Sequence, residues 1–581
     1  MNRWIKLAGA VLLAVLLLGT VLALALPRWV DPNAHRDELM RAVSERTGRT
    51  LTLDGKIGLS VFPWLGLELN GVSLNNAPGF GDTPMLAVHH AWVGVRLWPL
   101  LSGRLEVGTV ALDGLQLNLM RAADGRTNWQ DLQTRLANPA TPTPPPAPAQ
   151  PAAENRFGLN RLDITGVQIR QGRLLWEDRR DNQRYALTDW NLTTGHVYFG
   201  GAVPVKSSFT LSVGNPNLDA ETTLDGKLEL APEAGRYAIE NLKLETRLRS
   251  SRLLGNGVLP FRLSGSGIWQ SKVPSTLGPL KLEIGPYQAA NQHIEALILT
   301  VGEVALDAAQ SHAQLKGVEL AGQKLLWAGR GTDSLLLKTE GAVNWDTGRI
   351  DLPRFDLDAV GLRPMPNAAP IAVTGGSALS ADWNRHHLEA PALSLKIIGR
   401  LGPAPDQGLL NPIANGKVSY DWDAGRLAVD GLKLAAEQVD LGAGRVLPKT
   451  ELGADVAGTL SSQRWSVKNL SLHSADLIHA TGEVEVTGGA AGLGYRGRVE
   501  IPAFPPRPLL TALKITPPAT AAPDALRSLA LNSAFTGTAE RIALDTLRLD
   551  LDGGRMQGRA ALAWDPRPRL ETDLTADHLD I

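Results

Sequence analysis

Alternating apolar and polar residues run through this chain from residue 51 nearly to its end, and this pattern limits what the chain can fold into. Leu242 and Leu244, for example, flank Lys243. Successive side chains of a β-strand point to opposite faces, so the pattern predicts strands with one apolar face and one charged face. The chain is therefore expected to be mostly β.

Helical patterns are confined to two segments, residues 33–47 and 508–529, and three prolines interrupt the second. An amphipathic sheet normally buries its apolar face against helices or against a second sheet. For residues 156–581 two arrangements remain, because no helices are predicted there in sufficient number. The strands form either stacked β-sandwiches or one long curled sheet whose concave face meets a non-protein apolar partner.

A weak sequence repeat recurs along the predicted strands. It consists of an apolar residue, a polar residue, Gly or Asn, an aliphatic residue, any residue and Leu. It occurs at residues 112–117, 239–244, 315–320, 429–434 and 467–472. The Gly or Asn shifts the alternation by one position, which predicts a tight turn, a β-bulge or a sharp bend in the strand. The repeat itself favours a stack of similar strand units over unrelated hairpins.

The N-terminus is expected to anchor the chain in a membrane. Residues 7–26 carry no charge and, at about 1.5 Å per residue, form a helix about 30 Å long, which matches a bilayer core. Arg3 and Lys6 precede this segment, so residues 1–6 are expected in the cytoplasm and the rest on the far side. The alternative is a signal peptide cleaved near Ala23-Leu24-Ala25. Both interpretations export the remainder of the chain.

Three further parts are expected. Residues 31–136 form an N-terminal β domain with one short amphipathic helix, which starts at Asp31-Pro32 and stops at Gly48. This helix either covers one end of the sheet or lies on a membrane surface. Residues 137–155 form a Pro/Ala-rich linker, and residues 156–581 form the elongated β region.

Composition disfavours several classes of function. Charged residues make up 20% of the chain and the formal net charge is -1, so no basic excess is available to neutralise a nucleic acid. The absence of cysteine removes disulfides, thiolate metal sites and cysteine nucleophiles.

Motifs typical of catalytic, cofactor-binding or metal-binding sites are weak throughout the sequence. Gly492–Gly497 matches the dinucleotide fingerprint in its letters, but a strand-like sequence and Pro502 follow where a helix is needed. The pairs His89-His90 and His386-His387 would point to opposite faces of a strand, which disfavours a shared metal ion. Asp421 and Asp423 flank Trp422, and this alternation is typical of an ordinary sheet surface. Ser264-Gly265-Ser266-Gly267 lacks the form of a nucleophile elbow. We therefore expect no enzymatic activity, no catalytic residues, no cofactor and no metal.

An aromatic-rich patch occurs early in the exported region. Its members are Phe62, Trp64, Trp92 and Trp98. These residues would line the entrance of a groove, touch the bilayer near the anchor, or pack in the core of the N-terminal domain.

Several motifs resemble the AsmA-like family in residues and in order. They are Thr47-Gly48-Arg49, Phe62–Leu67, Asn76-Ala77-Pro78-Gly79-Phe80, Leu112-Asp113-Gly114, Asp124–Trp129, Gly172-Arg173-Leu174, Asn215-Pro216, Arg507 with Leu509-Leu510, Pro523–Leu526 and Asp552–Gly558. The resemblance implies an inner-membrane protein of a Gram-negative bacterium that works in the periplasm on lipid homeostasis of the outer membrane. It also implies kinship with TamB-type and chorein-type bridge lipid-transfer proteins. The sequence stops at Leu579-Asp580-Ile581 in a strand-like pattern that in the family leads into further sequence, so the resemblance implies truncation at the C-terminus.

Together the alternation and the resemblance predict a β-taco, a long curled antiparallel β-sheet groove that shelters phospholipid acyl chains. The expected function is phospholipid transfer that maintains the outer membrane and the integrity of the envelope. Candidate groove residues are Leu65, Leu67, Leu69, Leu115, Leu117, Leu228, Leu230, Leu242, Leu244, Val484 and Val486. Expected partners are phospholipid, the inner membrane, and outer-membrane or periplasmic proteins. The alternative is a structural or assembly factor for outer-membrane proteins that carries no lipid.

Overall fold

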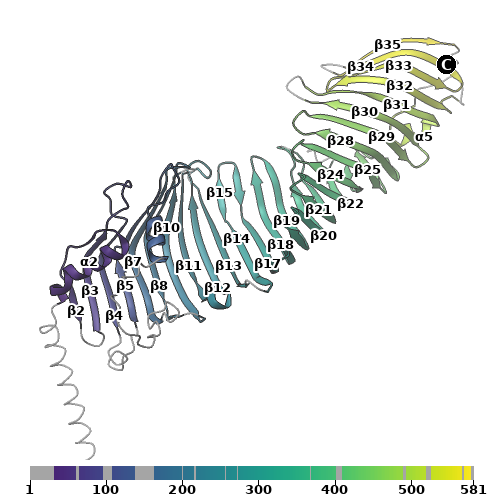
Figure 1. Cartoon of the computed structure of the whole chain (residues 1–581). Helices are drawn as coiled ribbons and strands as arrows, with labels where there is room; N and C mark the ends of the chain where they lie inside the picture. The colour runs from purple at the N-terminus through teal and green to yellow at the C-terminus, as the bar shows by residue number, and fades with distance from the viewer. Residues whose placement is uncertain are drawn as a thin grey trace, which may run out of the picture. The chain divides into compact units, whose positions relative to one another are not determined.

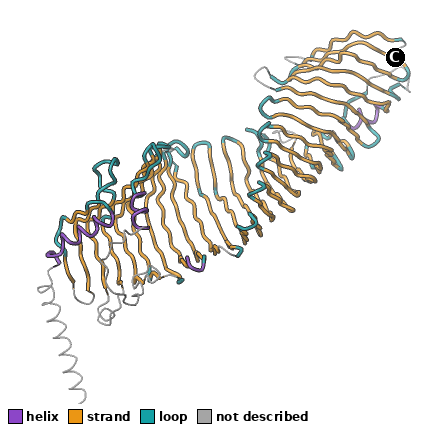
Figure 2. The backbone as a smooth tube through the Cα atoms, viewed as in Figure 1, coloured by secondary structure: helices purple, strands orange, loops and turns teal. Residues whose placement is uncertain are grey.

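The computed structural model describes residues 32–60, 65–95, 107–137, 163–198, 200–214, 217–255, 257–270, 273–366, 368–400, 408–488, 492–517, 525–564 and 568–577. Most of these residues lie in β-strands, as the alternation predicted (Figures 1 and 2). The chain divides into two compact units, Met1–Ala289 and Ala290–Ile581.

The first unit begins with a 3-10 turn, Pro32–His35, and helix α2, Arg36–Thr47; helix α4 spans Gln130–Ala137. Its strands are β1 (Leu51–Leu53), β2 (Gly58–Ser60), β3 (Leu65–Leu74), β4 (Leu86–Val95), β5 (Val107–Asp113), β6 (Gln116–Arg121), β7 (Asp163–Asp178), β8 (Gln183–Thr194), β9 (Val197–Tyr198), β10 (Ala202–Val213), β11 (Leu218–Ala231), β12 (Arg236–Arg249), β13 (Val258–Gln270), β14 (Ser275–Ile284) and β15 (Tyr287–Ala289). A second 3-10 turn, Pro232–Ala234, joins β11 to β12.

The strands of this unit pair mostly with their neighbours in sequence. Antiparallel pairs lead from β3 through β4 to β5, and from β7 through β8, β10, β11, β12 and β13 to β14. However, β5 and β6 both pair with β7 in parallel, so the expectation of a wholly antiparallel sheet is wrong here. A parallel neighbour requires the chain to return to the same end of the sheet, and residues 122–162 separate β6 from β7. The segments before and after the predicted linker therefore share one sheet.

The N-terminal end of this sheet contains a closed core. Val88, Ala91, Leu115 and Ile169 are buried together, and half-buried residues such as Trp190 pack around them. These four residues come from β4, the β5–β6 junction and β7. Ordinary side-chain burial therefore stabilises this end of the sheet.

Three of the sequence motifs meet beside this core in a buried polar cluster. The Arg49 guanidinium donates to the Asp131 carboxylate at 2.6 Å and to the Asn128 carbonyl. The fully buried Asn128 side chain donates to Asn76 Oδ1 at 2.9 Å and accepts from the Met120 amide at 2.9 Å. The motif residues thus join the end of α2, the start of α4 and β6, and their role here is structural.

The second unit contains the remaining elements. Its strands are β16 (Gln292–Ile294), β17 (Ala296–Asp307), β18 (His312–Trp327), β19 (Arg330–Asn344), β20 (Arg349–Leu362), β21 (Ile371–Asp382), β22 (His387–Arg400), β23 (Leu409–Leu410), β24 (Ile413–Asp421), β25 (Arg426–Ala436), β26 (Val439–Gly442), β27 (Arg445–Leu447), β28 (Thr450–Thr459), β29 (Arg464–Ser474), β30 (Ile478–Thr487), β31 (Gly494–Phe504), β32 (Leu529–Thr538), β33 (Arg541–Leu551), β34 (Gly554–Ala563) and β35 (Arg569–Ala576). Helix α5, Pro506–Ala512, is shorter than the segment predicted there.

The second unit is an antiparallel meander. From β17 to β35 each strand pairs with the next, except that β23 is a short side pairing on β22 and that β26 and β27 form a separate ribbon between β25 and β28. Figure 2 shows this succession of strands, most of them joined by short loops, and a longer connection with α5 joins β31 to β32.

The weak sequence repeat forms bulges and bends in the strands, as predicted. Gly114, Asn241, Gly317, Gly431 and Asn469 all have left-handed φ angles between 49° and 64°. The last four coincide with register shifts, and Gly114 separates β5 from β6. Each bulge places the extra residue on one strand, so the apolar residues before and after it stay on the same face.

The predicted helix at residues 33–47 is present as α2, which ends at Gly48 in a left-handed conformation. No residue of α2 is buried and Leu39 is exposed, so the helix contributes little to covering the sheet. No helix in residues 32–577, so far as the structure describes them, is long and apolar enough to cross a bilayer. The predicted cytoplasmic residues 1–6 and the predicted anchor 7–26 lie outside the described residues.

Candidate functional site

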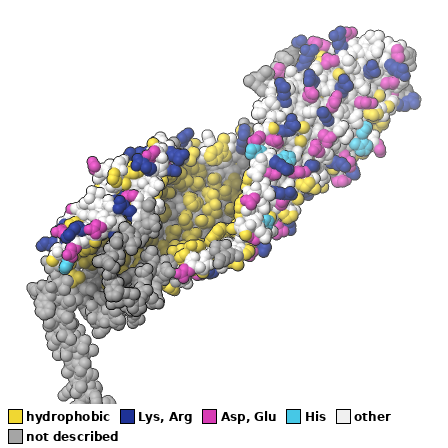
Figure 3. All heavy atoms as spheres, in the orientation of Figure 1, with side chains coloured by type: hydrophobic (Ala, Val, Ile, Leu, Met, Phe, Trp, Pro, Cys, Tyr) yellow, Lys and Arg dark blue, Asp and Glu magenta, His cyan; other side chains and the backbone are white. Residues whose placement is uncertain are grey.

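Apolar residues of the first unit line up across neighbouring strands. Register partners on adjacent strands point to the same face. One row of successive partners contains only leucine and alanine: Leu117, Leu174, Leu187, Leu211, Ala220, Leu248 and Leu259. We call the face that carries such rows the inner face. Figure 3 shows hydrophobic side chains gathered on a hollowed surface in the region of β11–β14.

A second row of the first unit is interrupted by one serine. Its members are Leu69, Ala91, Leu112, Ile169, Leu192, Ser207, Leu224, Leu244, Leu263 and Leu282. The Ser207 hydroxyl donates to the Asn191 carbonyl at 3.0 Å and accepts from the Trp190 indole at 3.1 Å. Because both hydrogen bonds are made within the protein, Ser207 adds little polarity to the inner face.

The inner face of the second unit carries longer rows. One row reaches from β17 to β30: Leu299, Leu320, Leu337, Leu357, Gly375, Leu395, Ala414, Leu434, Leu452, Leu472 and Ala480. Another reaches from β17 to β35: Leu306, Ala313, Val343, Ile350, Ala381, Leu388, Tyr420, Leu427, Gly458, Trp465, Val486, Tyr495, Gly537, Ile542, Leu562 and Leu570. Every member is apolar or glycine.

Apart from Ala91 and Ile169, which belong to the closed core, few of the inner-face residues that the structure describes are buried. After residue 170, the buried apolar residues that the structure describes are alanines and a few others: Ala220, Ala238, Ala313, Ala359, Ala390, Ala436, Ala454, Val203, Val373, Tyr287 and Leu547. Most leucines of the rows are partly buried, whereas Leu562 and Leu570 retain 39% and 69% of their accessible surface. Full burial of a leucine contributes about 1.5–3 kcal/mol, so each partly exposed leucine leaves a fraction of that for an apolar ligand to supply. We call this surface in each unit the apolar trough.

The opposite face is charged and wet. Ion pairs cross neighbouring strands there, such as Lys316 with Glu303 at 3.1 Å and Lys417 with Glu389 at 2.6 Å. The hydrogen bond between the last two groups raises the pKa of Lys417 and lowers the pKa of Glu389. Such exposed pairs contribute little to stability, but they keep this face soluble.

The structure places most of the predicted groove residues on the inner face. Leu67, Leu69, Leu117, Leu228, Leu242, Leu244, Val484 and Val486 are half-buried there, and Leu230 is exposed. Leu115 belongs instead to the closed core beside Val88 and Ile169, because the N-terminal end of the sheet folds tightly enough to bury it. Leu65 begins β3 opposite Val95, and its side chain lies outside the described part.

The weak chemical motifs occupy ordinary structural positions. Gly494 begins strand β31, whereas a dinucleotide site needs a helix at this point. Asp421 caps a turn by accepting from the Ala424 amide at 2.8 Å, and Asp423 pairs with His386. Ser266 accepts from the Asn241 amide at 3.0 Å.

Histidines do not assemble a metal site in the part of the chain that the structure covers. His90 contacts Glu68 at 2.9 Å, and no group of three metal-binding side chains occurs among the described residues.

The predicted aromatic patch is only partly described. Phe62, Trp64 and Trp98 lie outside the described residues. Trp92 lies in β4, and its indole covers Gly66 and Gly94 so closely that a Cβ at either position would clash with the ring. Trp92 therefore packs on the sheet next to two glycines.

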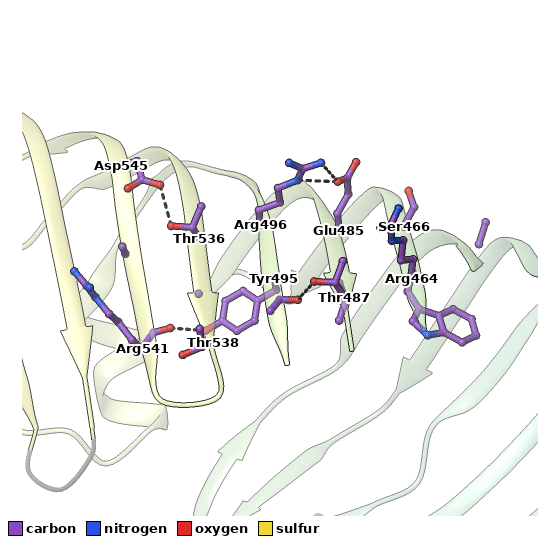
Figure 4. A pocket seen from close by; sticks show the side chains of 16 residues that line it. Arg464, Ser466, Glu485, Thr487, Tyr495, Arg496, Thr536, Thr538, Arg541 and Asp545 are labelled. Carbon is purple, nitrogen blue, oxygen red and sulfur yellow. Dashed lines mark hydrogen bonds and ion pairs between the residues drawn. The ribbon is translucent and has the colours of Figure 1, made fainter. Parts of the chain in front are cut away.

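A pocket of about 970 Å³ lies over β28–β33 (Figure 4). Its polar lining residues alternate with the long apolar row, of which Trp465, Val486, Tyr495 and Gly537 also line it. Arg496 and Glu485 form an ion pair at 2.5 Å on one side, and Thr536 donates to Asp545 at 3.1 Å on the other. The pocket thus meets side chains of the charged face as well as members of the apolar row.

Sequence reasoning missed a series of tryptophans at strand ends. Trp345, Trp383 and Trp422 each follow the last residue of a strand, and each follows Asn or Asp. Their nearly regular spacing was the signal that could have revealed them.

Comparison with known proteins relates this chain to one family. The model of the AsmA family matches residues 1–348. "Protein AsmA" of Escherichia coli (strain K12) is 36% identical over 109 residues, which are 19% of this chain and 17% of that protein. No solved structure matches.

Proposed function

Because the chain belongs to the AsmA family, as its match over residues 1–348 shows, we propose that its apolar trough binds the acyl chains of membrane phospholipids. The observation that carries this proposal is the apolar row from β17 to β35, whose members other than Ala313 stay partly or fully exposed among the described residues. An apolar sheet face of this kind, when surrounded by water, needs an apolar partner to complete its burial.

The energetics fit a lipid ligand. Each methylene group left in water costs about 0.8 kcal/mol, so one long acyl chain needs roughly 10 kcal/mol of apolar shelter to leave a bilayer. The rows of leucine and valine supply such shelter continuously along each sheet. The charged opposite face keeps the protein soluble while the acyl chains stay covered. The proposed action is passive binding and transfer, without a catalytic step.

The proposed location is the periplasmic side of the inner membrane. The uncharged segment 7–26 would anchor the chain, and both β units would lie in the periplasm. The protein would thereby contribute to lipid homeostasis of the outer membrane, together with partners at either end.

The test is lipid retention by the full-length protein after purification, measured by mass spectrometry of extracted lipid. Replacing Leu242 and Leu244 together by Glu places two charges on the inner face of β12. We expect retained phospholipid to fall severalfold, because the charges must be buried against hydrocarbon. The matched control, Lys243→Glu with Glu245→Lys, changes charge on the opposite face of the same strand and should retain lipid as the parent does.

Circular dichroism checks that both variants keep their β content. A parent protein that retains no lipid contradicts the proposal and supports an assembly factor instead. Unfolding of the Leu242→Glu, Leu244→Glu variant with an intact control contradicts it too, since that result is expected of a closed core.

A further inference from the structure

Three exposed tryptophans occupy equivalent places on the sheet of the second unit. Trp345, Trp383 and Trp422 directly follow β19, β21 and β24, and 40%, 40% and 37% of their surface is exposed. Each tryptophan begins the tight turn that leads to the next strand, so all three lie at the same edge of the sheet. We call these three residues the tryptophan edge.

The backbone sets the interval between the tryptophans. The amides of Trp383 and Trp422 donate to carbonyls of the preceding turns, those of Gly348 and His386, at 2.9 and 3.1 Å. One strand, β20 or β22, therefore separates each tryptophan from the next. With about 4.8 Å between neighbouring strands, the tryptophan positions repeat every ~10 Å along the hydrogen-bonding direction of the sheet.

A hydrogen-bonding side chain directly follows each tryptophan. The three residues are Asp346, Asn384 and Asp423. The Asn384 amide lies against Gly348, because a Cβ built on that glycine would come within 2.6 Å of the amide nitrogen. The Asp346 carboxylate forms no ion pair with any residue that the structure describes, whereas Asp423 pairs with His386. Each turn thus presents one aromatic ring and one polar group.

Exposed apolar residues at the opposite end of the strands form no such series. Trp327 is the last residue of β18, and Val360 lies inside β20, two residues before its end. Ala328 follows the first and Gly361 follows the second, so neither has a polar neighbour. The regular interval and the polar residue after each ring therefore distinguish the tryptophan edge.

These features fit an extended polysaccharide. A pyranose ring with equatorial hydroxyls has apolar C–H faces, which pack on an aromatic ring, and peripheral hydroxyls, which form hydrogen bonds with carboxylates and amides. In a β-1,4-linked chain every second ring presents the same face, and the length of this disaccharide repeat matches the interval between the tryptophans. An extended peptide presents side chains on one face every ~7 Å, which does not match it.

We propose that the tryptophan edge binds an extended β-1,4-linked glycan strand of peptidoglycan. The glycan lies across β19–β24 along the hydrogen-bonding direction of the sheet. Alternate sugar rings rest on the three indoles, and sugar hydroxyls form hydrogen bonds with Asp346 and Asn384. This binding site is additional to the proposed lipid site. The glycan class follows from the tryptophan edge itself, and the choice of peptidoglycan rests on the periplasmic location proposed above.

The dependence of affinity on glycan length tests the repeat without any substitution. The full-length protein in detergent is titrated by calorimetry with the dimer and the hexamer of β-1,4-linked N-acetylglucosamine. We expect the hexamer to bind at least about tenfold more tightly, because only the hexamer reaches all three indoles at once. Equal affinities, or no binding of the hexamer, would overturn the proposal.

The linkage is tested with two hexamers of glucose. The β-1,4-linked hexamer is extended, whereas the α-1,4-linked hexamer is curved and cannot place alternate rings on a straight row of indoles. We expect only the β-linked hexamer to bind. Equal binding of the two hexamers contradicts the role of the tryptophan interval.

Replacing the central ring tests the stacking. Trp383→Leu keeps an apolar side chain that this place tolerates, since Leu460 follows β28 in the same way and its amide donates to the Gly425 carbonyl at 2.9 Å. We expect the variant to bind the N-acetylglucosamine hexamer about tenfold more weakly, the loss expected for one stacked ring.

Trp327→Leu is the matched control, because Trp327 is 58% exposed at the opposite end of the strands. It should bind the hexamer as the parent does, and circular dichroism should show the same β content in both variants. An unchanged affinity in Trp383→Leu, or an equal loss in the two variants, argues against stacking at the tryptophan edge.

Cosedimentation with purified peptidoglycan sacculi tests the source of the glycan. We expect the parent to sediment with sacculi, and the Trp345→Leu, Trp383→Leu, Trp422→Leu variant to sediment severalfold less. A parent that binds the hexamer but stays in the supernatant would exclude peptidoglycan as the ligand. Sedimentation of the triple variant at the level of the parent would show that sacculi bind elsewhere on the protein and would also count against the proposal.

Discussion

One carboxylate of this protein, Asp552, accepts hydrogen bonds from several backbone amides of a single loop. The Asp552 side chain accepts hydrogen bonds from the consecutive amides of Leu526, Arg527 and Ser528, the last two at 2.8 Å. The hydrogen bond from Ser528 is the largest cause, and together with those from Leu526 and Arg527 it lowers the pKa of Asp552 below its usual 3.8 despite partial desolvation. A lowered folded-state pKa means that this contribution is complete above the ordinary pKa and is lost as pH falls through the folded value.

This linkage predicts that the segment before β32 loosens in acid. Amide hydrogen exchange of Arg527 and Ser528, corrected for the intrinsic rate at each pH, should show constant protection near neutrality. Protection should decline as pH falls below 3.8 and through the lowered pKa of Asp552. Asp552→Asn should show the low protection at every pH, since an amide cannot replace the ionised acceptor. Equal protection of the parent across this range would contradict the assignment.

At the scale of the element, the bulge decides how each strand uses its apolar residues. Val429 and Leu432 are three residues apart, yet both are inner-face residues because Asp430 and Gly431 form a bulge between them. Gly431 has φ +60°, and a Cβ built on it meets nothing within 4 Å. The preference for glycine here is therefore a matter of backbone conformation alone.

Substitutions at Gly431 test this account. Gly431→Val should destabilise the β25–β28 pairing by about 2 kcal/mol, because a β-branched residue resists the left-handed region. Gly431→Asn should cost much less, since Asn241 and Asn469 occupy equivalent bulges at φ 51° and 49°. Exchange protection of the Leu432 and Val456 amides measures both effects. Equal loss in the two variants would indicate a steric cause, which the open space around Gly431 does not support.

At the scale of the whole molecule, the proposed lipid transfer depends on the apolar rows more than on any single pocket. A row such as Leu320, Leu337 and Leu357 continues from strand to strand, so a lipid bound there, as we propose, would shift without exposing hydrocarbon at each step. Transfer along the sheet should then be sensitive to one charge in the row. Binding elsewhere in the trough should persist.

We therefore expect Leu357→Arg to slow lipid transfer between donor and acceptor vesicles far more than it reduces the lipid retained by the protein. Asp358→Arg, which adds the same side chain to the exposed neighbouring position, is the control and should transfer lipid normally. A parallel fall in transfer and retention would indicate a set of independent sites in place of a continuous surface.

By itself, the sequence determined the strands, their two unlike faces and the bulges, because these follow from the period of the side chains and from residues such as Gly317 and Asn469 that favour left-handed conformations. It also placed Leu242 and Leu244 on the apolar face. Only the tertiary structure decided that β7 pairs in parallel with β5 and β6, that Leu115 is buried, and that Trp345, Trp383 and Trp422 lie along one edge of the sheet. Those facts depend on which strands become neighbours and in what register, and contacts between residues far apart in the chain set that register.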